Sequence, residues 1–200
     1  MRKALEDPPT KEKLLSAAQH LILEKGFVGT SVDDICAAAR LTKGSFFHYF
    51  KSKDRLGVEL LRKYCESSKT AFKTCCCPQE KDPLKRVYWF LDLMIKKARR
   101  KAATGCLLGC MAQELSDTHP EIRSISARGF PGMAEALKRD LAEAKARYKP
   151  KASVDPQGLA DHFVAVLEGG MLVAKVRRTP GAMEANLKHF KQYLKGLFGR

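Results

Sequence analysis

Apolar residues recur three and four positions apart along most of the chain, and turn-forming residues separate one such run from the next. In residues 10–25 this spacing predicts an amphipathic helix, with Thr10 as its N-terminal cap and Gly26 at its end. No stretch alternates apolar and polar residues between turn signals, so no strand is predicted. The pattern indicates an all-α fold of about nine helices.

Short helices joined by tight turns are predicted in the first part of the chain. Ser31, with Asp34 three residues later, resembles a capping box and predicts a helix start. Thr42 and Ser52 are expected to cap the third and fourth helices. Residues 1–55 are therefore predicted to form a small head.

Longer helices with broad apolar faces are predicted in residues 56–200, the larger body. A capping side chain before a proline suits the first turn of a helix, and this device recurs at Asp82-Pro83, Thr118-His119-Pro120, Asp155-Pro156 and Thr179-Pro180. Residues 82–101 are apolar almost all round, which predicts a central helix enclosed by others.

Composition and charge narrow the class of protein. The excess of 15 positive charges attracts polyanions, although a solvated basic surface without a specific partner explains it as well. Lys96 and Lys97 interrupt the longest apolar run, so no membrane span is expected. The first residues hold acids and prolines where an export signal needs an apolar stretch, and seven cysteines do not fit a secreted disulfide framework, so a cytoplasmic location is expected.

The predicted third helix, in residues 42–50, has an unusual outer surface. Helical spacing directs Phe46 and Phe50 into the core with Leu41 and leaves the other side chains outward. A short helix, a turn and a second helix form the arrangement that offers the second helix to a DNA major groove. Glycine, hydroxyl groups, donors and exposed aromatic rings suit contacts with phosphates and base edges. We therefore expect a helix-turn-helix DNA-binding domain in residues 1–55.

Two motifs carry a resemblance to a known family. They read Gly26-Phe27-x-x-Thr30-Ser31-Val32-x-x-Ile35 and Leu41-Thr42-Lys43-Gly44-Ser45-Phe46-Phe47-His48-Tyr49-Phe50-Lys51-Ser52-Lys53-x-x-Leu56. They resemble the DNA-binding head of the TetR family of bacterial transcriptional regulators. The resemblance implies a homodimer, usually a repressor, whose two heads enter successive major grooves of a palindromic operator on double-stranded DNA. It also implies release of the DNA when a ligand binds the body.

The resemblance assigns roles to individual residues. Those expected in or at the groove are Lys43, Gly44, Ser45, Phe47 and His48, and those expected to hold phosphates are Thr30, Thr42, Tyr49 and Lys53. Each role has a plainer alternative, since Phe47 and His48 could pack inside the head, and Tyr49 and Lys53 could be ordinary surface residues. Cys36 stands where a small apolar residue is more usual and is interpreted as part of the core.

The last two predicted helices carry apolar residues that suit near-parallel packing. These residues step by three and four, at Leu159, Phe163, Val166 and Gly170 and then at Met183, Leu187, Phe190, Leu194 and Leu197. Two such helices from each subunit would build a four-helix dimer interface. The alternative is that the same residues form a core within one chain.

An unknown small-molecule inducer is expected to bind in the body. The candidate lining residues are Trp89, Leu93, Phe130, Met133 and Phe163, although such residues equally form plain core. Four polar residues without an obvious surface role are expected to orient the ligand, namely Tyr88, Gln113, Glu114 and His162.

Cysteines add a second mode of sensing. Cys106 and Cys110, four residues apart, would lie on one helix face. Residues 105–123 resemble the branch of the TetR family that includes the electrophile-responsive NemR and the acrylate-responsive AcuR, with a cysteine at the position of Cys106. Near a helix N-terminus and the basic residues Arg99, Arg100 and Lys101, the Cys106 thiol is expected to have a lowered pKa and to react with electrophiles or oxidants. An inert buried thiol is the alternative.

Other chemistry ranks lower. Adjacent Cys75, Cys76 and Cys77 are expected at a helix end, where oxidation is their natural chemistry. A zinc site from Cys106, Cys110 and His119 matches no common spacing, so no metal is expected. No phosphate-binding loop or paired carboxylates occur, so neither a cofactor nor catalysis is expected. The alternatives to a regulator are a dimeric small-molecule or redox-sensing binding protein and a thiol-dependent enzyme.

Overall fold

The computed structural model describes residues 9–74, 79–100, 105–179 and 181–199. Within these ranges the chain forms nine α-helices and no strand, which confirms the all-α prediction. None of the described helices is both long enough and apolar enough to cross a membrane. The predicted cluster Cys75 to Cys77 lies outside the described residues.

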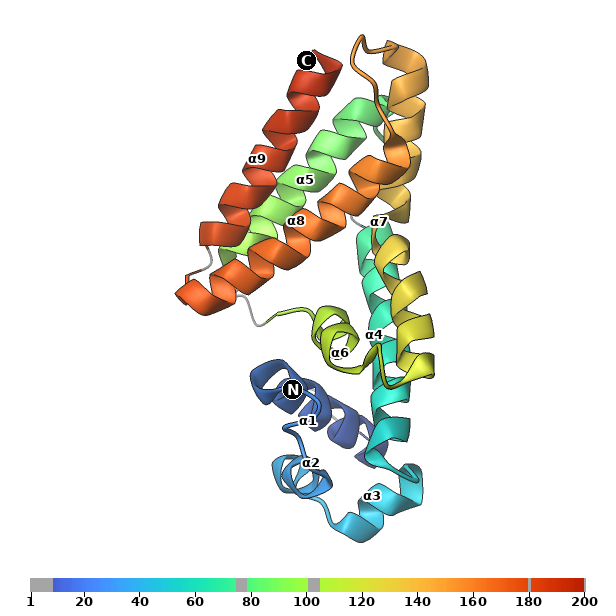
Figure 1. The fold of residues 1–200 in the computed structure, drawn as a ribbon, viewed down its shortest axis with the longest axis vertical. Helices are drawn as coiled ribbons and strands as arrows, with labels where there is room; N and C mark the ends of the chain where they lie inside the picture. Colours follow the sequence, from blue (N-terminus) through green and yellow to red (C-terminus); the bar gives the residue numbers. More distant parts are fainter. Residues whose placement is uncertain (1–8, 75–78, 101–104, 180, 200) are drawn as a thin grey trace, which may run out of the picture.

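The helices divide into a head at one end and a larger body (Figure 1). The head contains α1 (Thr10–Lys25), α2 (Val32–Ala39), α3 (Lys43–Tyr49) and the first turns of α4 (Lys53–Thr74). The body contains the rest of α4 with α5 (Pro83–Arg100), α6 (Leu107–Leu115), α7 (Pro120–Tyr148), α8 (Pro156–Arg177) and α9 (Gly181–Phe198). Helix α4 continues from the head into the body, where it packs along α7.

Most of the predicted helix caps are present. The Ser31 hydroxyl accepts from the Asp34 amide at 3.0 Å, and the Asp34 carboxylate accepts from the Ser31 amide at 2.9 Å, which completes the capping box. The predicted caps at Thr42, Ser52, Asp82 and Asp155 likewise accept bonds from backbone amides.

Three predicted helix starts need comment. The prediction for Thr10 is wrong, because α1 already begins at that residue and Pro9 precedes it without a side-chain cap. At α7 the capping position belongs to His119, also without a side-chain cap bond, and the Thr118 hydroxyl lies 2.8 Å from the His119 ring. Helix α9 begins at Gly181, and Pro180 lies outside the described residues.

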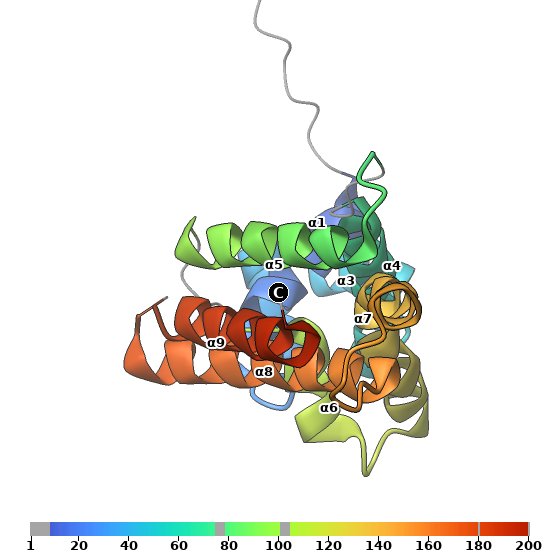
Figure 2. The same ribbon diagram turned by 90° about the horizontal axis from the view of Figure 1, so that it is seen from above.

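Helix α5 is an outer layer of the body, so the prediction of an enclosed central helix is wrong. Seen from above, α5 lies on one side of α9, and α8 lies on the other (Figure 2). Residues three and four apart along α5 form an exposed stripe, at Lys85, Trp89, Asp92, Lys96 and Arg99. The opposite side of the helix is buried, as an amphipathic helix requires.

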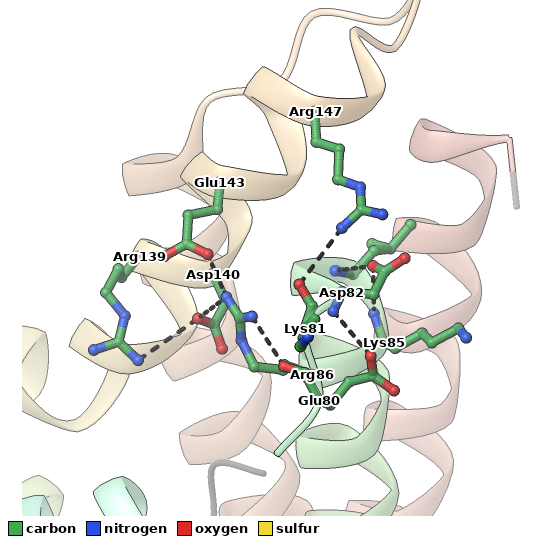
Figure 3. Close-up of polar contacts among 10 residues, drawn as sticks. Glu80, Lys81, Asp82, Lys85, Arg86, Arg139, Asp140, Glu143 and Arg147 are labelled. Carbon is green, nitrogen blue, oxygen red and sulfur yellow. Dashed lines mark hydrogen bonds and ion pairs between the residues drawn. The ribbon is translucent and has the colours of Figure 1, made fainter. Parts of the chain in front are cut away.

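A polar network joins the start of α5 to α7 (Figure 3). The Arg86 guanidinium donates to Asp140 at 3.0 Å, and the two side chains are only 14% and 5% exposed. Arg86 also contacts Glu143, and the Tyr148 hydroxyl donates to Asp82. Burial alone would raise the pKa of Asp82, but bonds from Tyr148 and from backbone amides outweigh burial and lower it. The network links the start of α5 to the C-terminal half of α7.

Candidate nucleic-acid interface and sensing body

The turn between α2 and α3 fixes the direction of the short third helix. Arg40 closes α2 in the left-handed conformation, with φ of 56°, and Thr42 then caps α3 by accepting from the Ser45 amide at 3.1 Å. Phe46 is fully buried, and its ring lies 5.7 Å from that of buried Phe50. These two anchors hold one face of α3 against the head core, as the spacing predicts.

The opposite face of α3 is exposed and aromatic. Phe47 is 54% exposed and Tyr49 is 42% exposed, and the His48 ring lies 4.8 Å from the Tyr49 ring. Phe47 and His48 are therefore not packed inside the head, which removes the plainer alternative for both. Lys43 is also exposed and forms an ion pair with Asp33 at 2.8 Å, which raises the pKa of the lysine.

The two small residues of this face leave room for close approach. Gly44 is exposed, and a Cβ atom added there would meet only the Thr42 hydroxyl, at 3.6 Å. Packing within the described chain therefore does not require glycine at this position. Ser45 is half-buried, with its hydroxyl 3.1 Å from that of Thr42.

Two residues expected to hold phosphates have other partners. Thr30 is only 1% exposed, and its hydroxyl donates to the Gly26 carbonyl at 2.7 Å, so the side chain is unavailable to a phosphate. The Lys53 ammonium donates to the carbonyls of Phe27 at 2.9 Å and Thr30 at 2.8 Å. Both side chains satisfy buried or half-buried backbone groups of the α1–α2 turn instead.

The apolar residues predicted to form a dimer seam lie mainly inside the chain. Most of them are buried where α8 and α9 meet each other and α5, including Leu159, Phe163, Leu187, Phe190 and Leu194. This outcome corresponds to the intramolecular alternative. A different face of α8 and α9 is exposed, with Leu172 at 56%, Val176 at 75% and Tyr193 at 48%. The predicted apolar spacing along α8 and α9 was correct, but these apolar faces pack against α5 of the same chain.

The five candidate ligand-lining residues do not share one cavity wall. Trp89 is 43% exposed, and Phe163 is fully buried between the rings of Phe90 and Phe190. Met133 lines an open groove of about 410 Å³ between α4 and α7, while Leu93 and Phe130 are half-buried. The prediction of a common pocket failed because helical periodicity identifies buried faces but not which buried faces meet.

The polar residues expected beside a ligand are also differently placed. Gln113, Glu114 and His162 are exposed, and the His162 ring packs on Phe190 and Tyr193. Tyr88 is half-buried, and burial raises its pKa to about 12. Tyr64 of α4 and Glu168 of α8 are half-buried polar residues of the body. Sequence reasoning missed both, because each is one polar position in an otherwise ordinary helix.

Cys106 lies at the junction of α4, α6 and α8. As predicted, it stands at a helix N-terminus, where its sulfur accepts from the Gly109 amide at 3.5 Å and lies 3.6 Å from the Tyr64 hydroxyl. The absence of a side chain at Gly109 makes room for the Glu168 carboxylate. One Glu168 oxygen is buried without a hydrogen-bond partner among the described residues.

The predicted lowering of the Cys106 pKa is wrong. Burial, and then the nearby Glu168 charge, raise the pKa of this thiol to about 12. Arg99 is occupied by an ion pair with Glu184 at 2.7 Å, and the side chains of Arg100 and Lys101 lie outside what the structure describes. Cys110 is half-buried, and burial raises its pKa too. The described residues contain no group of three or more His, Cys, Asp or Glu able to hold a metal ion.

A helix-turn-helix head that exposes aromatic and basic side chains, joined to a larger helical body, defines the class of one-component DNA-binding regulators. Comparison with protein families agrees. The tetracyclin repressor-like C-terminal domain matches residues 83–190, and the DNA-binding domain of bacterial regulatory proteins of the tetR family matches residues 14–60. The chain therefore belongs to the TetR family of DNA-binding transcriptional regulators.

Curated relatives extend the match to nearly the whole chain. The repressor NemR of Escherichia coli strain K12 is 25% identical over 186 residues, covering 92% of this chain and 94% of the relative. The regulator AcuR of Cereibacter sphaeroides is 29% identical over 187 residues, covering 91% and 84%. The repressor DhaR of Mycobacterium sp. strain GP1 is 26% identical over 170 residues, covering 85% and 84%. All three are transcriptional regulators, not enzymes.

Solved structures give the same result. The reduced form of Escherichia coli NemR superposes with a TM-score of 0.76 at 27% identity, covering 92% of this chain and 96% of that one. A TetR regulatory protein from Rhodobacter sphaeroides superposes with a TM-score of 0.80 at 27% identity, covering 92% and 97%. The all-α fold, the helix-turn-helix head and the similarity to NemR and AcuR were all expected from the sequence.

Proposed function

We propose that the chain is a cytoplasmic homodimeric repressor that holds a palindromic operator with two copies of α3 and releases it when the body senses a small molecule. The outward face of α3 carries this proposal, because Phe47 and Tyr49 are exposed although two neighbouring phenylalanines are buried. Exposed aromatic side chains cost hydrophobic free energy unless a partner covers them. Membership of a family of DNA-binding regulators supports DNA as that partner.

The residues of this face have separate proposed roles. Base edges and the groove wall are assigned to Lys43, Gly44, Ser45, Phe47 and His48, and phosphates to Thr42 and Tyr49. Lys43 must leave Asp33 to reach DNA, which an incoming polyanion favours. Thr30 and Lys53 are assigned to the architecture of the head and not to DNA.

Dimerisation is assigned to the outward face of α8 and α9. Gly169, Leu172 and Val176 follow helical spacing on α8, and Tyr193 and Gly196 lie on α9. A Cβ atom added at Gly169 or Gly196 meets no described atom within 4 Å, so a partner helix can approach closely there. A second copy of the same two helices would complete a four-helix bundle.

Sensing is assigned to the interior around Tyr64, Cys106 and Glu168. One buried oxygen of Glu168 finds no hydrogen-bond partner in the described ranges, which supports a noncovalent ligand that donates a hydrogen bond there. Modification of Cys106 by an electrophile or oxidant is the second candidate mode, favoured by the chain's similarity to the reduced form of NemR. If a Cys106→Ser variant still releases DNA normally after treatment with N-ethylmaleimide or hypochlorite, the thiol mode is discarded.

The test of the DNA-binding role is fluorescence anisotropy with duplexes from the region upstream of the chain's own gene. The wild-type dimer should bind one such duplex, and Phe47→Ala should weaken that binding at least about tenfold by removing apolar contact in the groove. Trp89→Ala is a matched control, because it removes another exposed aromatic ring, 43% exposed against 54% for Phe47, from α5. Equal binding by Phe47→Ala and wild type would contradict the role of α3.

A further inference from the structure

A side chain from the body holds the turn that joins α1 to α2 in the head. One oxygen of Glu114, in the last turn of α6, accepts from the Phe27 amide at 3.1 Å, and the other accepts from the Val28 amide at 2.8 Å. Gly26 makes this approach possible, because its φ is +83° and a Cβ atom there would lie 2.5 Å from the carboxylate. The contact joins residues that are 86 and 87 positions apart in sequence.

The carbonyl groups of the same turn are held from another helix. Lys53, at the start of α4, donates to the Phe27 and Thr30 carbonyls, and its ammonium lies 4.5 Å from the centre of the Phe27 ring. Glu114 therefore binds the amides of the turn and Lys53 binds its carbonyls. The turn has little freedom to move unless α4 or α6 moves with it.

A third contact reaches the adjoining end of α1. Lys175 of α8 donates to the Leu23 carbonyl at 2.9 Å. Two helices of the body, α6 and α8, thus contact residues 23–30, and α6 does so through a carboxylate that accepts two backbone hydrogen bonds. Each of these contacts has one ionised side chain, which strengthens its hydrogen bonds, and Glu114 provides such a contact from α6.

The two ends of α6 have different surroundings. Its first residues follow Cys106, beside Tyr64 and Glu168 in the body interior, and its last turn presents Glu114 to the head. Nine helical residues span about 13 Å and behave as a rigid rod. A change at the Cys106 end therefore displaces the Glu114 end.

The α1–α2 turn leads directly into the DNA-facing helices. Ser31, the residue after Thr30, caps α2, and α2 is followed by the left-handed Arg40 and then by α3. Because these connections are short and capped, a displacement of the turn carries α2 and α3 with it. The position of α6 thus determines how α3 is presented.

We propose that Glu114 is the positioning residue that couples the sensing body to the DNA-binding head, by tying the α1–α2 turn to α6. The proposal rests on the proposed DNA-binding function. Coupling of this kind is reciprocal, so DNA bound at the head must change the stability of α6 in the body.

This reciprocity gives a test that needs no knowledge of the inducer. Amide hydrogen exchange is measured on the full-length protein with and without the upstream duplex, for wild type, Glu114→Gln and Gln113→Ala. In wild type, DNA should slow exchange at least about threefold in both α3 and α6. Glu114→Gln keeps one acceptor oxygen but loses the other and the charge, so DNA should still slow exchange in α3 but no longer in α6.

Gln113→Ala is the matched control, because Gln113 is the exposed neighbour of Glu114 on the same helix. It should behave like wild type. If Glu114→Gln keeps the wild-type protection of α6, or if wild type shows no protection of α6 when DNA is bound, the coupling role is overturned while DNA binding stands. If wild type binds no upstream duplex, the proposed function fails and the coupling fails with it.

Discussion

The head and the body both contain side chains in environments that folding alone does not favour, but in opposite senses. In the head the exceptions are aromatic rings turned outward, at Phe47 and Tyr49. In the body they are charged groups turned inward, such as Asp140 at 3% exposure and the Glu168 oxygen that has no hydrogen-bond partner within the described part of the chain. An outward apolar group gains free energy from an external partner, whereas an inward charge depends on fixed partners inside.

The head is therefore expected to respond to an external partner, and the body to a change among its internal contacts. The exposed face of α3 is already formed in the free head, so the proposed DNA complex requires little change in its shape. The body is held by buried polar contacts, so anything that alters one of them changes helix positions. The following variants test that contrast.

The largest loss of operator affinity is expected from changes on the outward face of α8 and α9. Leu172→Glu combined with Val176→Glu places two like charges where a second copy should pack, so the dimer should dissociate and operator affinity should fall more than about a hundredfold. Light scattering after size-exclusion chromatography measures the dissociation. Trp89→Glu puts a charge on another exposed apolar residue and should remain dimeric. A dimeric double variant would show that this face is not the interface.

The next effect concerns the buried charge in the body. Arg86→Ala leaves Asp140 buried without its main partner, which should lower the free energy of unfolding by about 3 kcal/mol, the lower end for such pairs because Arg139 lies 3.6 Å from the same oxygen. Arg55→Ala removes an ion pair to Glu121 between side chains that are 59% and 40% exposed, and should cost less than about 1 kcal/mol. Urea unfolding compares the two variants, and equal losses would refute the contrast.

Sequence reasoning succeeded where local chemistry decides the outcome. Ser31, Thr42 and Asp82 act as caps because a cap depends on residues within one turn, and the burial of Phe46 beside exposed Phe47 follows from helix geometry. It failed where partners are distant in sequence. The period of α8 and α9 was right, yet which neighbour covers them depends on how α5 packs.

The site shows the same limit. The resemblance assigns residues to the DNA interface, but the partners of Lys53 are backbone carbonyls 23 and 26 positions away, which no local pattern reveals. Likewise, the high pKa of Cys106 arises from burial and from Glu168, and neither is visible in residues 99–110. Basic neighbours in sequence were a poor guide to the charge around the thiol.

The state of Cys106 predicts a specific pH dependence. Burial and the nearby Glu168 charge raise the pKa of Cys106 to about 12, so at any pH well below 12 the thiolate fraction increases tenfold for each unit by which the pH increases. The rate of alkylation by N-ethylmaleimide should therefore increase about a hundredfold from pH 7 to pH 9 without levelling off. Peptide mapping assigns the rate to Cys106. A plateau near pH 7 would mean that the thiol is activated and that the interior is less enclosed than the structure indicates.

A variant of Lys53 tests whether this residue contacts DNA or supports the α1–α2 turn. Lys53→Ala should weaken operator binding by about tenfold because the α1–α2 turn loses its carbonyl contacts, while the dependence of affinity on salt should stay unchanged. Lys43→Ala should instead lower the salt slope by up to about 0.9, because an ammonium in the groove displaces counterions from the neighbouring phosphates. Binding measured across a series of salt concentrations decides between the two roles. A weaker dependence of affinity on salt for Lys53→Ala would show that the Lys53 ammonium contacts DNA.

The smallest effect comes from two glycines, one in each region, that have room for a methyl group. A Cβ atom at Gly132 in α7 meets no described atom within 4 Å, and one at Gly44 in α3 meets only the Thr42 hydroxyl at 3.6 Å. Because alanine loses less conformational entropy than glycine in a helix, Gly132→Ala should raise the free energy of unfolding by up to about 1 kcal/mol, and Gly44→Ala, in a first turn, by less. Their effects on DNA should differ, since a methyl group at Gly44 obstructs close approach to the duplex and one at Gly132 does not. Anisotropy should therefore show weaker operator binding for Gly44→Ala alone, and equal affinities for the two variants would mean that the position of Gly44 is not at the groove.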